Sequence, residues 1–571
     1  MRVLPVSWAG LAIKMSLSLI AALCVLPFLY HHNALPIVSY HSEWLAVLLG
    51  LLAVLAALPV LLSGSLALPR VALLPLGLVA FLFLQTQLLS PIVNEHVQTA
   101  IAYLLWAALL IIFSYNLRQS LVLSHLVQPL AVALLVGAVF VAGIEVALRF
   151  VPKMTEQWGG VGQLASYTDY LSLGLASGLY CWAKHEHARH WLKGLLVAAI
   201  TVVVFGLSLG SSSASWVYCI ALVVLAFLTP GRYSSAIKQM LLAVVVLFAF
   251  IQVLADFGAL PAQLHLPTAT ERVLEEVEGA PIRWHLWRAA GQLFLQTPWL
   301  GQGFGQFDWG YFTLGNALPA LPDRIDNAHN IFMQVLSELG VFPFIGLLIG
   351  LSFWLQGLIK TPTTLERWWL LGLLAIIGLH SLVEYPLWYS YFLGIAALLL
   401  GLGEQQAYPL TVNTPVKWGV GLVLPVLLAL CVNHFNSYRQ LEKLVEPLNY
   451  TDWIPSMPDF IKGAQEISTR TPELVPYISV VLSSLDKSKD GDAAGKLPLS
   501  EKALNFMPTA QQAYRHVLLL ALAGQQQEAR SLFQQVLKTY PAGAGAFVKD
   551  LKESSPDVQQ KTGYLVEMVN G

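Results

Sequence analysis

Residues 43–62 read EWLAVLLGLLAVLAALPVLL, an apolar run whose only charged residue is the first. A helix needs about 20 such residues to cross the hydrocarbon core of a bilayer. Similar runs recur along the chain, which has 571 residues, is 56% hydrophobic and is only 11% charged. Soluble domains carry about 25% charged residues. The sequence therefore predicts an all-α polytopic membrane protein.

Thirteen transmembrane helices are predicted. They are expected near residues 10–28, 43–62, 71–90, 98–115, 126–148, 165–183, 191–208, 214–229, 238–256, 329–358, 368–383, 386–404 and 416–433. We expect the first run to be an uncleaved transmembrane helix, because no small-x-small cleavage site follows it. The four cysteines (Cys24, Cys181, Cys219 and Cys431) lie in apolar runs without metal-type spacing, so we expect no disulfides.

The distribution of lysine and arginine predicts the orientation of the chain. These residues gather in or beside the loops of one side: Arg70, Arg118, Lys184, Arg189, Lys193, Arg232, Lys238, Lys360, Arg367 and Lys417. The positive-inside rule makes that side cytoplasmic. The loop at 29–42, the long loop at 257–328 and the tail after residue 433 then lie on the outer side. Four parts follow: helices at 1–256, a large outer loop at 257–328, helices at 329–433 and a helical outer domain at 434–571.

The tail has the composition of a soluble helical domain. Two apolar helical faces are separated by Gly524 and end before Pro541; they comprise Ala513, Val517, Leu520 and Ala521, then Ala529, Phe533, Val536 and Leu537. The second face resembles half of a tetratricopeptide repeat, so a TPR-like domain is predicted. An ordinary helical hairpin fits the same pattern equally well.

The main candidate for chemistry is His329, in the polar segment from Arg324 to Asn330. Asn327, Asn330, Gln334 and Glu338 recur at helical spacing around it. We expect these residues to share one face of a helix that Asp326 or Asn327 caps. Polar groups at membrane depth usually face an aqueous cavity or the interior of a helix bundle. The face therefore predicts a wet cavity opening at His329, or alternatively a stripe of helix-packing hydrogen bonds.

Arginines of the long loop are candidates for binding phosphate. Guanidinium forms bidentate contacts with phosphate oxygens, and we assign this role to Arg283 and Arg324. Arg288 is interpreted as an ordinary interfacial arginine. The glycine-rich stretch 298–307 has no βαβ context, so it predicts a close-packed turn rather than a nucleotide loop.

Two further outer segments hold candidate binding residues. The loop at 29–42 contains His31, His32 and His41 and leads to Glu43, but its spacing fits no zinc pattern and no metal is expected. Glu384 lies between two predicted helices, beside a proline and several aromatic residues, where it is suited to orient a cation. The net charge of −1 gives no reason to expect binding of nucleic acid.

These segments resemble the bacterial PglL-type protein O-oligosaccharyltransferases of the O-antigen ligase/Wzy superfamily. The matching stretches are residues 32–36 with Glu43, 283–287, 298–307, 326–338 and 380–389. Two stretches depart from the family pattern. Residues 207–215 lack the arginine of a Ser-Arg pair, and residues 159–165 lack the asparagine of a Gly-x-x-Gly-Gln-x-Asn stretch. Either another cation replaces the missing arginine, or the chain belongs to a divergent branch with its own donor or acceptor.

The resemblance implies a glycosyltransferase of the bacterial inner membrane with a periplasmic active site. It would move a preassembled glycan en bloc from undecaprenyl pyrophosphate to Ser or Thr of a periplasmic protein such as a type IV pilin, without a metal or other cofactor. His329, Arg283 and Arg324 would be catalytic. The substrate-binding residues would be Asn330, Gln334, Asp326, Asn327, His32, Glu43 and Glu384. An O-antigen ligase or Wzy-type polymerase with a sugar acceptor, and a non-catalytic transporter of lipid-linked glycans, remain alternatives.

Overall fold

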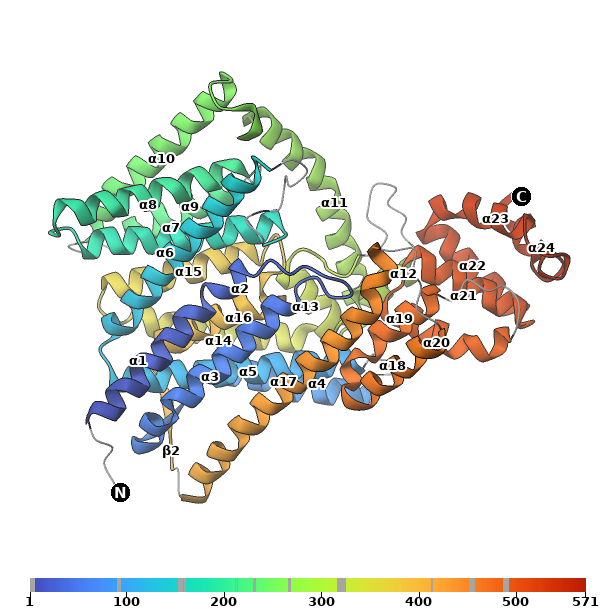
Figure 1. Cartoon of the computed structure of the whole chain (residues 1–571), viewed down its shortest axis with the longest axis horizontal. Coiled ribbons are helices and arrows are strands. Elements are labelled where there is room, and N and C mark those ends of the chain that lie inside the picture. Colours follow the sequence, from blue (N-terminus) through green and yellow to red (C-terminus); the bar gives the residue numbers. More distant parts are fainter. Residues whose placement is uncertain are drawn as a thin grey trace. The chain divides into compact units, whose positions relative to one another are not determined.

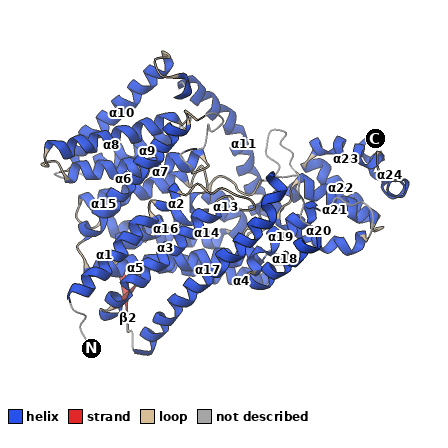
Figure 2. Cartoon of the chain, in the orientation of Figure 1, coloured by secondary structure: helices blue, strands red, loops and turns tan. Residues whose placement is uncertain are grey.

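The computed structural model describes residues 6–89, 94–151, 158, 161–210, 212, 214–228, 233–264, 269–315, 325–411, 414–450, 457–485 and 492–570. Almost all regular structure in this part of the chain is helical (Figure 2). The first ten helices are α1 (Val6–Leu23), α2 (Leu26–Leu29), α3 (Tyr40–Ser63), α4 (Leu73–Leu88), α5 (Asn94–Ser120), α6 (Leu123–Leu148), α7 (Leu164–Lys184), α8 (His190–Leu209), α9 (Ala214–Leu228) and α10 (Ser234–Asp256).

The chain continues through the predicted outer loop into further apolar helices and then the tail (Figure 1). The middle helices are α11 (Ala269–Gln296), α12 (Phe307–Leu314), α13 (Ile331–Leu339), α14 (Val341–Ile359), α15 (Leu365–His380), α16 (Ser390–Gly403) and α17 (Thr414–Tyr450). The tail contains α18 (Met457–Arg470), α19 (Val475–Leu485), α20 (Ala493–Phe506), α21 (Ala510–Leu522), α22 (Gln526–Thr539), α23 (Ala544–Lys552) and α24 (Pro556–Asn570). Short 3-10 turns occur at Arg70–Ala72, Ala262–Leu264, Pro386–Trp388, Pro472–Leu474 and Pro541–Gly543.

Nine helical stretches among the described residues are long and apolar enough to cross a membrane. They are Trp8–Leu29, Tyr40–Ser63, Arg70–Leu88, Asn94–Ser120, Leu123–Leu148, His190–Leu209, Ser234–Asp256, Val341–Ile359 and Gly419–Glu446. Helices α9 and α16 are apolar but shorter. The predicted all-α polytopic membrane fold is confirmed, whereas the total of thirteen membrane crossings stays a prediction.

The predicted span at 329–358 is wrong as a single helix. The chain forms α13, then turns at Gly340, then starts α14. Gly340 has a φ of 78°, a left-handed conformation that residues with a Cβ seldom adopt. His329 and Asn330 therefore precede a short helix of nine residues, and the membrane-length helix begins only at Val341.

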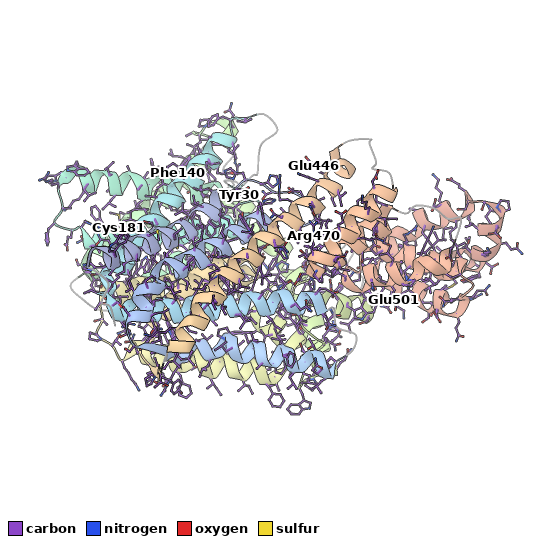
Figure 3. The ribbon with its side chains drawn as sticks, turned by 60° about the horizontal axis from the view of Figure 1, so that its bottom comes forward. Tyr30, Phe140, Cys181, Glu446, Arg470 and Glu501 are labelled. Atoms are coloured by element: carbon purple, nitrogen blue, oxygen red, sulfur yellow. The ribbon has the colours of Figure 1, made fainter. Side chains whose placement is uncertain are left out.

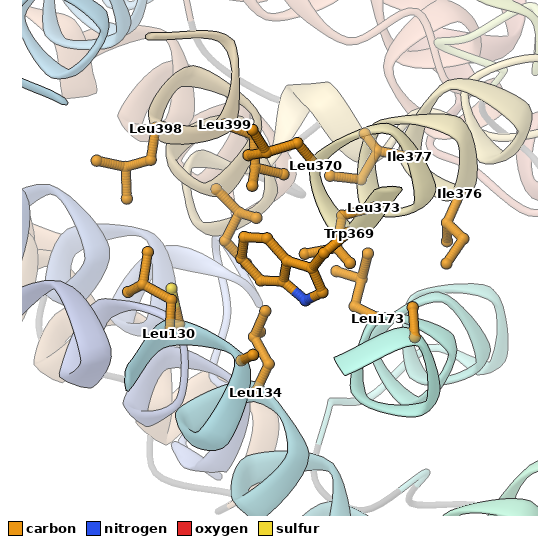
Figure 4. Close-up of a cluster of buried hydrophobic side chains, with 14 of the residues drawn as sticks. Leu130, Leu134, Leu173, Trp369, Leu370, Leu373, Ile376, Ile377, Leu398 and Leu399 are labelled. Carbon is orange, nitrogen blue, oxygen red and sulfur yellow. The ribbon is translucent and has the colours of Figure 1, made fainter. Parts of the chain in front are cut away.

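The chain forms two compact units, each assembled from three separated segments. Unit 1 comprises Met1–Val79, Tyr103–Pro281 and Gly346–Asn433. Its core is a continuous apolar cluster from most of its helices. Figure 4 shows Trp369 of α15 among leucines and isoleucines of its own helix and leucines of α6, α7 and α16. The indole N–H of Trp369 donates to the hydroxyl of Ser177 on α7, 3.0 Å away, so this buried polar group is satisfied.

A two-stranded antiparallel ladder joins distant parts of unit 1. Strand β1 (Leu66–Pro69) pairs with β2 (Ala407–Leu410), with Leu66 opposite Leu410. The side chain of Asn116 bonds the backbone of Ala67 through both its oxygen and its nitrogen, at 2.9 and 2.8 Å. The ladder fixes the chain next to α3 and α16, and the sequence analysis did not predict it.

Unit 2 comprises Ala80–Ala102, Ile282–Ile345 and His434–Gly571. Figure 3 marks Glu446, Arg470 and Glu501 on α17, α18 and α20, three helices that contribute to this unit. The predicted hairpin is confirmed as α21 and α22, with Gly524 between them at a φ of 83°. Seven of its eight predicted apolar residues are buried: Ala513, Val517, Leu520, Ala521, Ala529, Phe533 and Val536. The assignment to tetratricopeptide repeats stays a prediction.

The tail of unit 2 packs on helix α12 of the 257–328 segment. Phe312 of α12 is buried in the same apolar cluster as Val517 and Phe533. The hydroxyl of Thr539 donates to the carbonyl oxygen of Phe312 at 3.1 Å, and the ring of Tyr540 stacks on that of Phe312 with centroids 6.0 Å apart. The tail therefore holds α12 in a defined position within this unit.

Candidate functional site

His329 lies in a tight loop immediately before α13. Its φ is 50°, an uncommon conformation for a residue with a side chain. Its backbone N–H donates to Oδ1 of the buried Asn327 at 2.7 Å. The side chain of His329 is half-buried. A sparsely populated backbone conformation persists only where neighbouring contacts hold it, and such positions are frequent at functional sites.

The predicted cap of the helix is wrong in one respect. Asn330 is the N-cap of α13, and its side chain accepts hydrogen bonds from the backbone N–H groups of Phe332 and Met333, at 3.0 and 3.2 Å. Asn327 precedes the helix and binds the loop instead, while Asp326 is exposed. Because α13 starts at Ile331, only Gln334 and Glu338 of the predicted polar face lie within it.

Gln334 and Glu338 form a buried polar network. Oε1 of Gln334 accepts a hydrogen bond from the N–H of Ala328 at 2.7 Å, which links α13 back to the His329 loop. Oε1 of Glu338 accepts from the N–H of Phe307, the first residue of α12, at 3.1 Å. Burial raises the pKa of the Glu338 carboxyl to about 8, although bonds from Gly305, Phe307 and Gln334 oppose that rise. The acid is therefore largely protonated at neutral pH.

The glycine-rich stretch 298–307 is the close-packed turn that the sequence predicts. Its N–H groups at Gln302 and Gly303 donate to the carbonyls of Ser337 and Glu338, at 2.8 and 3.0 Å. These carbonyls lie at the end of α13, where helical partners are lacking. Gly301 has a φ of 69°, and a Cβ there would overlap the backbone of Glu338. A glycine is therefore required at 301 for the turn to close on α13.

A residue that the sequence analysis missed completes this junction. Gln85 of α4 is fully buried. Its Nε2 donates to the carbonyls of Leu300 and Glu338, at 2.6 and 2.8 Å, and its Oε1 accepts from the N–H of Phe304 at 3.1 Å. Gln85 could have been found from the sequence, because it is a glutamine within the predicted apolar span 71–90, and polar groups in such spans usually have a specific partner.

The candidate arginines differ in how they are placed. Arg283 is half-buried on α11, whereas Arg288 of the same helix is exposed, and Arg324 lies outside the described residues. Further along α11, Ala290 and Leu293 pack with Phe307 and Ala328. The helix of Arg283, the start of α12 and the loop of His329 therefore share one small apolar core.

A second group of candidate residues lies in unit 1. Glu43 is buried, and its carboxylate accepts hydrogen bonds from the hydroxyls of Ser39 and Tyr103, at 2.5 and 2.9 Å. The half-buried ring of His32 lies edge-on to that of His41, with centroids 4.2 Å apart. Glu43 is thus held firmly at the start of α3, with both carboxylate oxygens occupied by donors.

The segment around Glu384 approaches the same region of unit 1. Glu384 is half-buried, and its N–H donates to the carbonyl of His380 at 2.8 Å. The hydroxyl of Ser390 donates to the carbonyl of Glu43 at 2.8 Å, and the hydroxyl of Tyr389 lies 3.5 Å from Oε1 of Gln163. Folding of the chain therefore brings Glu43, Gln163 and the segment after Glu384 together, although they are far apart in sequence.

A buried polar cluster beneath this segment was also missed. Asp169 of α7 is fully buried, and neither carboxylate oxygen has a hydrogen-bond partner among the residues that the structure describes. Its Oδ1 is 3.9 Å from Nδ1 of His380, which in turn lies 2.7 Å from the hydroxyl of Tyr218. The sequence feature that could have indicated this cluster is the single aspartate in the apolar run 165–183. Its neighbours Tyr218 and His380 come from α9 and α15, and no sequence pattern links them to Asp169.

Comparison with known proteins supplies independent information. Residues 195–348, which include His329 and the α13 network, match the family model described as O-antigen ligase. Residues 368–554 match the model described as the C-terminal part of a virulence factor membrane-bound polymerase. A general O-oligosaccharyltransferase of Acinetobacter baylyi is 25% identical over 461 residues, which are 76% of this chain and 79% of that protein.

The two matched regions and the long alignment cover both the apolar helices and the tail. The motifs at 283–287, 298–307, 326–338 and 380–389, on which the resemblance to O-oligosaccharyltransferases is based, all lie within the two matched regions. The chain is a multi-pass membrane protein that is similar to an O-antigen ligase model over residues 195–348 and to a general O-oligosaccharyltransferase over most of its length.

Proposed function

We propose that this protein is a lipid-linked oligosaccharide:protein O-oligosaccharyltransferase. It transfers a preassembled glycan en bloc from undecaprenyl pyrophosphate to a Ser or Thr hydroxyl of a periplasmic protein. The alignment with the Acinetobacter baylyi general O-oligosaccharyltransferase is the observation that carries this proposal, because it spans most of both chains. The apolar helices suit a donor whose polyprenyl chain stays in the bilayer.

The proposed enzyme lies in the bacterial inner membrane, with the active site and the tail in the periplasm. The excess of lysine and arginine in the loops of the opposite side supports this orientation. The four parts proposed for the chain are the helices of 1–256, the outer loop of 257–328, the helices of 329–433 and the outer domain of 434–571.

His329 is the proposed acceptor-activating residue. Transfer forms a bond between the hydroxyl oxygen and the anomeric carbon of the glycan, and breaks the bond from that carbon to the phosphate oxygen. The hydroxyl proton passes to the imidazole, and undecaprenyl pyrophosphate leaves. A neutral imidazole can accept such a proton as a general base. The held, left-handed backbone of His329 supports a role that requires a fixed side-chain direction.

The remaining site residues have separate proposed roles. Arg283 and Arg324 stabilise the negative charge that develops on the departing pyrophosphate. Asn330 and Gln334 orient the His329 loop rather than bind sugar, since their side-chain oxygens already accept backbone hydrogen bonds. Asp326, Asn327, His32, Glu43 and Glu384 are proposed to contribute to binding of the donor or acceptor. These roles require no metal ion.

The acceptor is a periplasmic protein, and a type IV pilin is the proposed example. The helical tail is suited to contact it, because the tail packs on α12 beside the His329 loop within unit 2. Intact-mass analysis of pilins from cells with and without this protein tests the assignment. We expect a loss of one glycan mass when the protein is absent, and an unchanged mass would contradict a pilin acceptor.

The same assay tests His329 itself. We expect His329→Ala to abolish transfer while the protein still inserts into the membrane at normal abundance. His187→Ala is a matched control, because His187 is exposed in the turn between α7 and α8. Normal glycosylation of the acceptor by the His329→Ala variant would remove His329 from the mechanism.

An O-antigen ligase or polymerase with a sugar acceptor is the second candidate. The descriptions of the two matching family models favour it. Both candidates use the same class of donor, so the acceptor distinguishes them. Glycan transfer by the purified protein to lipopolysaccharide core, with no transfer to protein, would support this second candidate against the first.

A further inference from the structure

We propose that Glu338 is a positioning residue that holds the loop of His329 through Gln334. The proposal rests on the proposed role of His329 in transfer and assigns a function to a carboxyl group that touches neither donor nor acceptor. Glu338, Gln334 and the loop all belong to unit 2, and every contact that follows lies within this unit.

The first step is how Glu338 itself is fixed. Its backbone carbonyl accepts hydrogen bonds from the N–H of Gly303 and from Nε2 of Gln85, at 3.0 and 2.8 Å. A Cβ on Gly301 would overlap the same peptide unit. The backbone at Glu338 is therefore held between the glycine-rich turn and α4, so the position from which its side chain extends is fixed.

The second step is what the carboxyl group contacts. Its Oε1 accepts from the N–H of Phe307 at 3.1 Å, and the N–H of Gly305 and the amide of Gln334 also bond it. Phe307 opens α12, where unpaired N–H groups favour an acceptor. Helix α12 is anchored in turn by Phe312, which is buried against the tail. The carboxyl group of Glu338 is thus hydrogen-bonded to the N-terminus of α12, a helix that the tail holds in place.

The third step leads to His329. Because Gln334 contacts Glu338, its carboxamide has a defined orientation, and its Oε1 accepts the N–H of Ala328 at 2.7 Å. Ala328 is fully buried, and the next residue is His329 with its φ of 50°. The bond from Gln334 therefore acts directly on the peptide beside the strained residue. Without it, the loop is free to relax toward an ordinary backbone conformation.

Protonation modulates this network. The pKa of Glu338 is about 8 because burial opposes the charge, and the neighbouring Asp308 of α12 raises it further. A further titratable group beside the turn is His96 of α5, whose ring lies against Gly305. Burial favours the neutral acid, so above pH about 8 the network holds a buried negative charge, which the bonds from Gly305, Phe307 and Gln334 offset only in part. The amide introduced by Glu338→Gln is uncharged at every pH and preserves an acceptor oxygen.

Hydrogen exchange and transfer kinetics test the proposal together. The variants are Glu338→Ala, Glu338→Gln, Gln334→Ala and the double alanine variant, with Glu466→Ala as a control at an exposed glutamate of α18. We expect Glu338→Ala and Gln334→Ala to increase amide exchange in peptides covering 325–332, while α21 peptides stay unchanged. Their kcat should fall about tenfold or more, with donor KM changed less than roughly threefold.

Glu338→Gln should keep the exchange and the kcat of the wild type at pH 7, and should lack the decline in kcat above pH about 8. The double variant should be no slower than the slower single variant, because both residues act through one chain of contacts. Unchanged exchange at 325–332 in both alanine variants, or multiplicative effects on kcat, would overturn the proposal. If the wild type transfers no glycan, the proposed function fails, but the exchange comparison still decides the positioning role.

Discussion

Gly301 lies directly against the carbonyl group of Glu338, where a Cβ would overlap the peptide of the α13 terminus. The pair joins the glycine-rich turn at 298–307 to the helix that follows His329. Two N–H groups of the turn cap the last carbonyls of α13, and Gly340 ends the helix immediately afterwards. The short helix of the candidate site is thus closed at its C-terminal end by the backbone of the turn together with the side-chain amide of Gln85.

Gly301→Ala should therefore destabilise the protein and abolish transfer. The left-handed φ of 69° costs a residue with a Cβ about 1–2 kcal/mol, and the overlap with Glu338 adds to this. The thermal midpoint in detergent measures the effect. Gly291→Ala is the matched control on α11, because its Cβ would meet no atom within 4 Å. An equal midpoint for the two variants would contradict the close packing of the turn.

Arg283→Ala should weaken use of the lipid-linked donor. Loss of one charge-assisted hydrogen bond costs about 1.5–3 kcal/mol, so kcat/KM for the donor should fall about tenfold or more. Saturation curves in donor concentration, at fixed acceptor, measure this. Arg288→Ala should change kcat/KM for the donor less than roughly twofold, since Arg288 is exposed on the same helix. Superimposable curves for wild type and Arg283→Ala would exclude a phosphate role for Arg283.

Glu338→Gln should stabilise the protein in a pH-dependent way. The pKa of Glu338 rises from 4.5 to about 8 on folding. Below pH 4.5 both states are protonated, but between 4.5 and about 8 only the unfolded state ionises, so wild-type stability falls as pH rises. The loss is about 1.4 kcal/mol per pH unit at most.

The measurement is the difference in thermal midpoint between Glu338→Gln and wild type from pH 5 to pH 9. The difference should grow up to pH about 8 and then level off, because the amide of the variant does not titrate and the wild-type carboxyl is by then ionised in both states. A difference that stays constant over this range would show that the carboxyl does not change its protonation on unfolding.

Asp169→Asn should be tolerated without loss of stability. Both carboxylate oxygens are buried and have no hydrogen-bond partner in the described part of the chain, and an ionised group in such a site is costly. An amide keeps the shape and removes the charge, so the thermal midpoint should be equal or higher. By comparison, Tyr218→Phe should lower it, because it removes the 2.7 Å contact with His380 and leaves that ring nitrogen unpaired. A clear fall in Asp169→Asn would instead indicate a stabilising ion pair with His380.

The sequence by itself determined that this is a membrane protein. A long apolar run is stable in lipid as a helix, because a helix pairs all its backbone N–H and C=O groups within itself. The sequence also determined the tail hairpin, since the apolar periodicity from Ala513 to Val536 and the break at Gly524 are local signals. The unusual polarity of residues 326–338 identified this segment as the candidate site. The glycine-rich stretch at 298–307 was predicted as a tight turn. These features depend on neighbours in the chain, which a sequence displays directly.

Only the tertiary structure decided how the candidate site is held together. Gly340, where α13 ends, lies against the backbone of Trp299 and Gly301, which a Cβ at this position would overlap. Gln85 meets Glu338, and Asp169 meets His380, across more than 200 residues in each case. Long-range hydrogen bonds leave no periodic trace in the sequence, because each needs only one polar residue at each end. The polar network behind His329 therefore became visible only when the helices were packed.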